Sequence, residues 1–294
     1  MSWSGGKDSA YALHQIMLGG LYDVRYLVST IDGNSKRISI HEVPESLIEE
    51  QAFLIGIPLL KIYLHDQSNE AYKNQMGAML SRVKNEGIYH IIFGDLFLQD
   101  LRNYREEMMN RFGMQCVFPL WQMDSLFVVQ DFIAKGFRSI ICSVNETWLS
   151  QSWVGRAIDE ASVADLPASV DPCGENGEYH SFCYDGPVFQ HRIAIKSGLV
   201  SSKSFELKLS GVDGIASVTT TTLWYIHLSQ INALRRIECG RCGTSFECNA
   251  ADVINCQCNA VVITSTQQDL IKNNYADCLC ANCLQQLAGV QLSN

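Results

Sequence analysis

The chain has 294 residues, of which 47% are hydrophobic and 18% charged, a balance that excludes wholesale disorder. At roughly 100–200 residues per domain, this length allows one to three domains. The net charge of −9 argues against broad binding to nucleic acid or anionic membranes. Because the first residues lack the features of a signal peptide and no apolar run reaches about 18 residues, we expect a cytoplasmic protein.

The first half of the chain alternates between short apolar stretches and amphipathic segments. The expected strands are 22–31, 58–64, 88–94, 115–121 and 137–144, and the expected helices are 44–55, 70–86, 101–112 and 125–135. Strands separated by helices of this length predict an α/β fold with a parallel, doubly wound sheet. After residue 170 the pattern changes, and the stretches 178–184, 192–195, 205–209 and 218–228 predict antiparallel strands.

A Gly-Gly loop stands directly before a first predicted helix that ends at Gly19-Gly20. The loop consists of Ser4, Gly5, Gly6, Lys7, Asp8 and Ser9. Two glycines let backbone amides turn inward, and a helix N-terminus attracts anions. Serine hydroxyls and the Lys7 ammonium add donors, whereas Asp8 suits a Mg²⁺ ligand or an N-cap. We therefore predict a phosphate-binding loop rather than a serine-capped turn, although the spacing differs from that of the ordinary P-loop.

Three strings in the sequence together resemble a known family. SGGKDS resembles the pyrophosphate loop (PP-loop) of N-type ATP pyrophosphatases, which cleave ATP to AMP and pyrophosphate. GDLFLQDLRNYRE at 94–106 with FPLW at 118–121, and DPCGENGEYHSFCYDGPVF at 171–189, narrow the resemblance to the bacterial-type branch of the diphthine–ammonia ligase family. The resemblance covers about residues 1–195. That family usually has a short apolar strand before the loop, where this chain has Met1-Ser2-Trp3.

The resemblance implies a Rossmann-like, PP-loop ATP-binding domain at 1–122 and an α+β acceptor domain at 123–236. It implies an ATP-dependent ligase that adenylates an unidentified acceptor carboxylate, releases pyrophosphate and forms an amide with ammonia, with Mg²⁺ as cofactor. Residues 4–9 would then bind pyrophosphate, and Gly94 and Asp95 would face the nucleotide from a sheet edge. Arg102 and Arg105 are further candidates for contacting phosphate or an acceptor carboxylate.

An acidic motif forms the acceptor-side part of this resemblance. Gly174 and Gly177 allow tight turns, so Glu175, Glu178 and His180 can converge. A carboxylate pair there can bind Mg²⁺ or ammonium or position an amine; the alternative is a polar turn with solvated glutamates. The predicted catalytic residues are thus Lys7, Asp8, Glu175, Glu178 and His180. The other histidines, at positions 14, 41, 65, 90, 191 and 227, show no ligand-like spacing.

The C-terminal region at 237–285 is rich in cysteine. It contains Cys239, Cys242, Cys248, Cys256, Cys258, Cys278, Cys280 and Cys283. Two C-x-x-C pairs can complete one Cys₄ zinc site, and the other four cysteines can form a second site or none. The region resembles the short CWC module, with Gln257 in place of the central Trp. We predict one or two structural Zn²⁺ ions, with an iron–sulfur cluster as the alternative.

Two other functions compete with the ligase. The same loop together with cysteines is compatible with a PP-loop enzyme that transfers sulfur to tRNA, although the net charge of −9 counts against it. A non-catalytic ATP-binding regulatory protein, whose tail docks a partner, is the third alternative.

Overall fold

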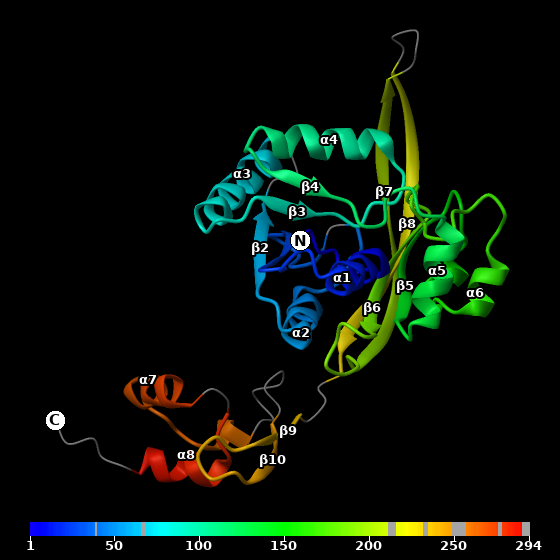
Figure 1. Cartoon of the computed structure of the whole chain (residues 1–294). Helices are drawn as coiled ribbons and strands as arrows, with labels where there is room; N and C mark the ends of the chain where they lie inside the picture. The colour runs from blue at the N-terminus through cyan, green and yellow to red at the C-terminus, as the bar shows by residue number, and fades with distance from the viewer. Residues whose placement is uncertain are drawn as a thin grey trace. The chain divides into compact units, whose positions relative to one another are not determined.

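The computed structural model describes residues 1–38, 40–65, 69–210, 216–231, 235–248, 257–275 and 278–289 (Figure 1). The chain divides into two units, Met1–Gln230 and Ile231–Asn294. In the part that is described, no helix is long and apolar enough to cross a membrane.

The first half of the larger unit alternates between helices and strands. Its elements are α1 (Lys7–Gly19), β1 (Leu27–Asp32), α2 (Glu45–Ile55), β2 (Leu59–Leu64), α3 (Asn69–Asn85), β3 (His90–Ile92), α4 (Gln99–Asn110) and β4 (Gln115–Val117). β1 pairs with β2 and β3 with β4, both in parallel. The predicted α/β class is therefore confirmed. The helices α1 and α2 end at Gly20 and Gly56, whose left-handed conformations favour glycine.

Residues 1–3 lie between these two parallel pairs. Ser2 pairs in parallel with Val28 of β1, and its N–H donates to the Ile92 carbonyl of β3 at 2.9 Å. The Trp3 N–H donates to the Val28 carbonyl at 2.8 Å, and its side chain is only 2% exposed. This short segment therefore joins β1 to β3 and leads directly from the sheet into the predicted phosphate loop.

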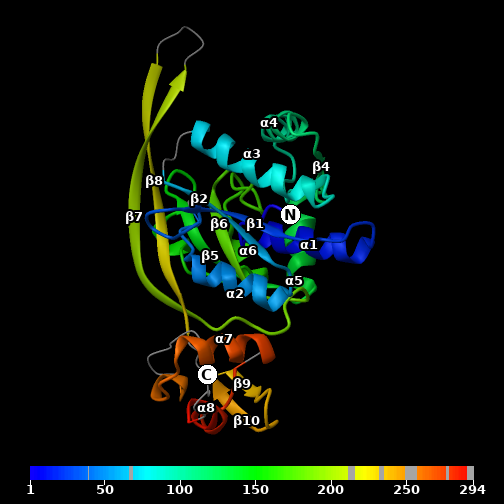
Figure 2. The same ribbon diagram turned by 90° about the vertical axis from the view of Figure 1, so that its left-hand side faces the viewer.

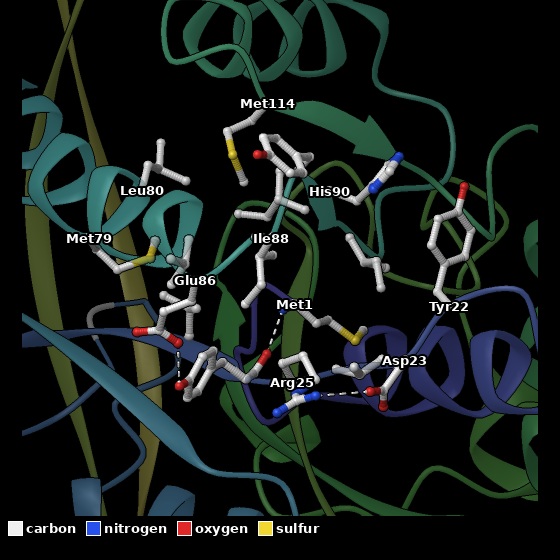
Figure 3. A pocket seen from close by; sticks show the side chains of 18 of the residues that line it. Met1, Tyr22, Asp23, Arg25, Met79, Leu80, Glu86, Ile88, His90 and Met114 are labelled. Atoms are coloured by element: carbon white, nitrogen blue, oxygen red, sulfur yellow. Dashed lines mark hydrogen bonds and ion pairs between the residues drawn. The ribbon is translucent and has the colours of Figure 1, made fainter.

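A cavity of about 590 Å³ lies beside Met1 at the amino ends of β1 and β3 (Figure 3). Residues 21–26 line it instead of extending β1 as predicted. The Met1 amine donates to the Tyr26 carbonyl, and burial lowers the pKa of this amine to about 5. Ligands of open α/β sheets bind at the carboxyl ends of strands, so we do not assign this cavity to the functional site.

The second half of the larger unit is built on an antiparallel sheet. Its elements are α5 (Ser125–Ala134), β5 (Arg138–Asn145), the 3₁₀ turn η1 (Gln151–Trp153), α6 (Glu160–Asp165), β6 (Tyr179–Asp185), β7 (Ile195–Ser210) and β8 (Ala216–Gln230). The strand order is β6-β5-β8-β7. β7 and β8 form a long ribbon, seen in both overall views (Figure 2). No separate strand forms at 192–195, because β7 begins at Ile195.

The predicted parallel pairing of the strand at 137–144 is wrong. β5 pairs antiparallel with both β6 and β8. Six consecutive residues of β5 are buried, and a run buried on both faces looks the same in parallel and antiparallel sheets. The direction of this strand depends on pairing with residues far along the chain, which periodicity does not reveal.

One hydrophobic cluster runs through both halves of the larger unit. It extends from Met1 to Leu228 and includes the buried faces of α1, α2, α5, β5 and β6. Behind α1, the Phe132 and Phe137 rings stack at 4.7 Å, and the Tyr11 ring meets Phe132 edge-on at 6.5 Å. The Tyr11 hydroxyl donates to Asp131 at 2.6 Å. These contacts hold α1, and with it the loop at its N-terminus.

The smaller unit contains short elements around its own apolar cluster. They are β9 (Arg235–Glu238), β10 (Ser245–Cys248), the 3₁₀ turn η3 (Gln257–Ala260), α7 (Ser265–Asn274) and α8 (Ala281–Ala288). β9 and β10 pair antiparallel. The buried members of the cluster are Cys239, Leu279, Cys280, Cys283 and Leu284. Such a core is small, so we expect an additional cross-link to hold this unit together.

Candidate functional site

The predicted phosphate loop leads from Trp3 into the N-terminus of α1. Gly5 has φ +79°, and a Cβ there would meet the Ile48 side chain at 2.6 Å, so this position requires glycine. Gly6 is the N-cap of α1, and its N–H donates to Ser4 Oγ at 3.2 Å. The helix N-terminus therefore faces the loop, as an anion site requires. Asp8 lies inside the first turn of α1, so its alternative role as the N-cap is wrong.

Lys7 is the charged centre of this loop. Its side chain is 3% exposed, and Nζ donates to both carboxylate oxygens of Asp8 at 2.8 Å. Nζ also donates to the Cys173 carbonyl, which belongs to the predicted acceptor-side motif. Burial opposes the ammonium charge, but the Asp8 carboxylate raises the pKa of Lys7 above its usual value. Lys7 thus connects the loop to the acidic motif.

Glu178 organises the acidic motif from inside. The side chain is fully buried, and its carboxylate accepts from Asp171 N at 2.9 Å, from Asn176 N at 2.9 Å and from Asn176 Nδ2 at 3.0 Å. The Asp171 side chain accepts in turn from the backbone N–H groups of Cys173 and Glu175. All of these Glu178 contacts lie within the turn, which indicates that Glu178 positions the Cys173 carbonyl and Glu175.

Glu175 faces the loop. Its Oε1 accepts from the Leu96 N–H at 2.8 Å. Burial raises the pKa of Glu175 to about 7, and the nearby Asp8 and Asp95 carboxylates act in the same direction. Gly94 lets the end of β3 approach α1, because a Cβ there would meet the Asp8 carbonyl at 3.0 Å. The structure therefore brings Lys7, Asp8, Gly94 and Glu175 together.

A second cavity, of about 280 Å³, adjoins the loop at residues 2–4. Its apolar lining includes Trp3, Ile38, Tyr72 and Met76, and its polar lining includes Ser4, Thr30, His41 and Arg105. Asp95 pairs with Arg105 through contacts of 2.6 and 3.1 Å. The Arg105 guanidinium also lies 4.3 Å from the centre of the Phe93 ring. Arg105, which the sequence predicts as a candidate ligand, lines this cavity.

His180 lies beside a histidine that the sequence did not single out. The rings of His41 and His180 are 4.8 Å apart, and His41 Nδ1 lies 3.1 Å from the Ser181 carbonyl. A Cβ on Gly6 would lie 3.2 Å from His41 Cε1, so His41 borders the loop. Burial lowers the pKa of His41 to about 4 and that of His180 well below its usual value. Both imidazoles are therefore neutral at pH 7.

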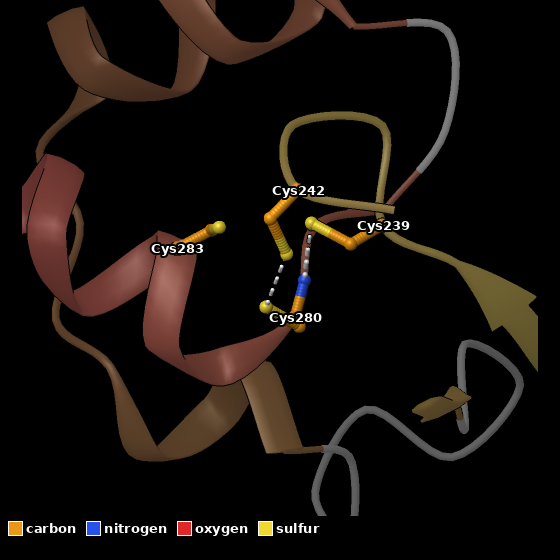
Figure 4. A group of neighbouring side chains, drawn as sticks. All are labelled: Cys239, Cys242, Cys280 and Cys283. Atoms are coloured by element: carbon orange, nitrogen blue, oxygen red, sulfur yellow. Dashed lines mark hydrogen bonds between the residues drawn. The ribbon is translucent and has the colours of Figure 1, made fainter. Parts of the chain in front are cut away.

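Four cysteines of the smaller unit converge (Figure 4). The sulfur atoms of Cys239, Cys242, Cys280 and Cys283 all lie within 4.8 Å of one another. The Cys242 and Cys280 sulfurs are 3.7 Å apart, which fits a tetrahedral ion with Zn–S bonds of about 2.3 Å and S···S edges of about 3.8 Å. Burial raises the pKa of Cys239, but backbone N–H donors, first that of Cys280, lower it overall to about 6. This group can hold a metal ion.

Three of the other four predicted cysteine ligands do not belong to this group. Cys248, Cys258 and Cys278 are described but lie outside the four-sulfur cluster. Cys256 lies outside the described residues. Among the residues that the structure describes, the cluster of the two C-x-x-C pairs is the one set with ligand spacing.

The half-buried pair His41 and His180 gives a prediction for pH dependence. In the unfolded chain the pKa of each histidine is about 6.5. Below that pH the unfolded state therefore binds protons that the native state does not bind. The contribution of both histidines to stability should therefore be fully present above about pH 6.5 and fall as the pH drops toward 4, with a loss of about 2 kcal/mol at pH 5 for His41. Urea unfolding of His41→Gln and His180→Gln at pH 7 and pH 5 should show a smaller acid loss than wild type.

The exposed His191 supplies the control for this measurement. His191→Gln should keep the wild-type acid loss. An unchanged acid loss in both His41→Gln and His180→Gln would show that other groups cause the destabilisation.

Comparison with known families matches three consecutive parts of the chain. The model of the diphthamide synthase N-terminal domain matches residues 1–116, and that of the diphthamide synthase C-terminal domain matches residues 124–221. The cysteine-rich CWC model matches residues 239–285. The loop, the cavity beside it and the acidic motif all lie in the first two matched regions.

Curated relatives give the same assignment at modest identity. The diphthine–ammonia ligase of Mus musculus is 24% identical over 249 residues, covering 77% of this chain and 91% of the mouse protein. That of Homo sapiens is 24% identical over 247 residues, covering 76% and 90%. That of Schizosaccharomyces pombe is 24% identical over 213 residues, and the match spans only 35% of that longer protein. The chain belongs to the diphthamide synthase family and carries a cysteine-rich CWC module at residues 239–285.

Proposed function

We propose that this protein is an ATP-dependent ligase that adenylates an acceptor carboxylate and converts it to an amide with ammonia. One observation carries the proposal: the Lys7 ammonium lies at the glycine loop and also contacts the Cys173 carbonyl of the acidic motif. The proposed phosphate site and the proposed acceptor site would then both contact the Lys7 ammonium. Its relatives are named for joining diphthine to ammonia, and the acceptor of this chain remains to be identified by experiment.

The nucleotide is proposed to span the loop and the second cavity. That cavity is lined by apolar side chains and also by Thr30 and Arg105, and such a mixed lining suits a base and a ribose. Ser4, Gly5, Gly6 and Ser9 would receive the β- and γ-phosphates through amides and hydroxyls. Mg²⁺, held by Asp8 and Glu175, would neutralise phosphate charge. Residues 1–122 would thus form a Rossmann-like PP-loop domain, residues 123–236 the acceptor domain and residues 237–285 the metal module.

The proposed reaction has two steps. The acceptor carboxylate attacks the α-phosphorus, the bond to the bridging oxygen breaks, and pyrophosphate leaves into the loop. Ammonia then attacks the acyl carbon of the adenylate, AMP leaves with the bonding electron pair, and the nitrogen loses one proton to solvent. Lys7 and the α1 N-terminus stabilise charge that develops on the leaving pyrophosphate. Glu175, whose pKa is near 7, suits binding of a cation on the acceptor side.

Product analysis tests the reaction class. Wild-type protein with ATP, Mg²⁺, ammonium and a panel of carboxylic acids should release AMP and pyrophosphate for the correct acid. Lys7→Met, which keeps the side-chain volume, should lower that rate by about 100-fold or more, because one preorganised charge is lost. Chromatography that finds ADP and phosphate would exclude this class, and ATP retained without AMP would favour a regulatory protein.

The two glutamates should respond in opposite ways. Glu175→Gln should raise stability at pH 8 by about 1–3 kcal/mol, because a carboxyl with a raised pKa loses native stability as the pH rises from about 4.5 through 7. Glu178→Gln should lower stability by about 1–3 kcal/mol, because its new NH₂ group faces backbone N–H donors. Urea unfolding at pH 8 measures both changes in the free energy of unfolding. Changes of the same sign in the two variants would contradict the different roles of the two glutamates.

We also propose that Cys239, Cys242, Cys280 and Cys283 hold one structural Zn²⁺. The proposal is supported by the sulfur spacing and by the small core of this unit. Four thiolates complete a tetrahedral site and leave no open position for catalysis. A second zinc on the remaining cysteines stays a prediction.

Metal removal should unfold the smaller unit and leave ATP binding intact. Zinc commonly supplies on the order of 10 kcal/mol of apparent binding free energy to such a module. Cys280→Ser should lose the metal, whereas Cys116→Ser, outside the cluster, should keep it. Elemental analysis and proteolysis of the tail provide the measurements. A brown protein containing iron would indicate an iron–sulfur cluster. A smaller unit that stays folded without metal would show that no metal ion is needed to stabilise it.

A further inference from the structure

Gln51 is a buried polar residue on the otherwise apolar inner face of α2. It is fully buried, as are its neighbours Leu47, Ile48 and Leu54. A buried amide is costly unless it is hydrogen-bonded. All hydrogen-bond partners of the Gln51 side chain lie far from it in the sequence. The amide therefore connects other segments of the chain and does not serve α2 itself.

The Gln51 amide joins three separate segments. Nε2 donates to the Gly5 carbonyl at 2.9 Å and to the Cys183 carbonyl of β6 at 2.6 Å. Oε1 accepts from Trp3 Nε1 at 2.9 Å. Both amide protons are therefore used, and the side chain is fixed between the segment before the loop, the loop itself and the strand that follows the acidic motif.

These contacts determine which way the Gly5–Gly6 peptide points. The Gly5 carbonyl accepts from Gln51 and from the Cys183 N–H at 2.8 Å, so it faces the protein interior. In a trans peptide the C=O and the following N–H point in opposite directions. The Gly6 N–H is thereby turned to the other side, toward Ser4 Oγ. An inverted peptide would present a carbonyl oxygen to the anion instead.

A peptide between two glycines has little steric resistance to inversion, because neither residue has a Cβ. Something outside the loop must therefore select one orientation. We propose that Gln51 is the positioning residue of the phosphate loop: it holds the Gly5 carbonyl inward so that the Gly6 N–H is available to pyrophosphate. This inference rests on the proposed function, and it adds a residue that lies outside the loop and the acidic motif.

The test compares the affinities for inorganic pyrophosphate and for adenosine. Gln51→Met keeps the length of the side chain but removes both donors. Its pyrophosphate affinity, measured by calorimetry, should fall at least tenfold, while its adenosine affinity stays within twofold of wild type. The matched control is Leu54→Ala on the same helix, which is equally buried and should lower the melting temperature without changing the ratio of the two affinities.

A measurement on the wild-type protein keeps the test valid if Gln51→Met fails to fold. With ¹⁵N-glycine labelling, pyrophosphate should shift the Gly6 amide resonance strongly, and adenosine should not. An unmoved Gly6 resonance in protein that binds pyrophosphate, or an unchanged affinity ratio in Gln51→Met, would overturn the inference and leave the proposed function standing. Wild-type protein that binds no pyrophosphate would instead remove the proposed function.

Discussion

The contact of the Lys7 ammonium with the Asp8 carboxylate and the Cys173 carbonyl is the interaction on which the rest of the site depends. An ammonium that is 3% exposed is tolerated only where a counter-charge and further acceptors replace water. Asp8 supplies the charge, and the turn at 171–178 supplies the carbonyl. The hydrogen bonds that Glu178 accepts within this turn hold the turn in shape, and the turn in its shape presents the Cys173 carbonyl to Lys7.

Hydrogen bonds join the predicted phosphate loop at residues 4–9 to β6. The Lys7 N–H donates to Ser181 Oγ at 3.0 Å, the Cys183 N–H donates to the Gly5 carbonyl, and Gln51 bonds to both Gly5 and Cys183. β6 directly follows the acidic motif. A displacement of the turn at 171–178 would therefore also displace the loop. The hydrophobic cluster shared by the two halves of the larger unit leaves little room for the halves to move independently.

Local signals in the sequence predicted local features well. The glycine end of α1 at Gly20 and the loop at the start of α1 depend on neighbouring residues. The two C-x-x-C pairs lie far apart in the sequence, and their convergence is predicted because each pair has the spacing of a metal half-site. The direction of β5 and the place of His41 beside the loop depend on contacts between distant segments. A lone histidine before α2 carries no trace of such partners, so periodicity and spacing could not reveal them.

The charges of the site place a condition on any triphosphate that enters it. Lys7 is paired with Asp8 and Arg105 with Asp95, so a carboxylate partly offsets the charge of each cation. Glu175 then adds a carboxylate, and the rise of its pKa to about 7 reflects burial and the negative charge already around it. Amides at the α1 N-terminus provide only partial positive charge. In the proposed function, ATP would therefore bind together with a divalent cation, and the Asp8 and Glu175 carboxylates that would hold this cation would link nucleotide binding to the acidic motif.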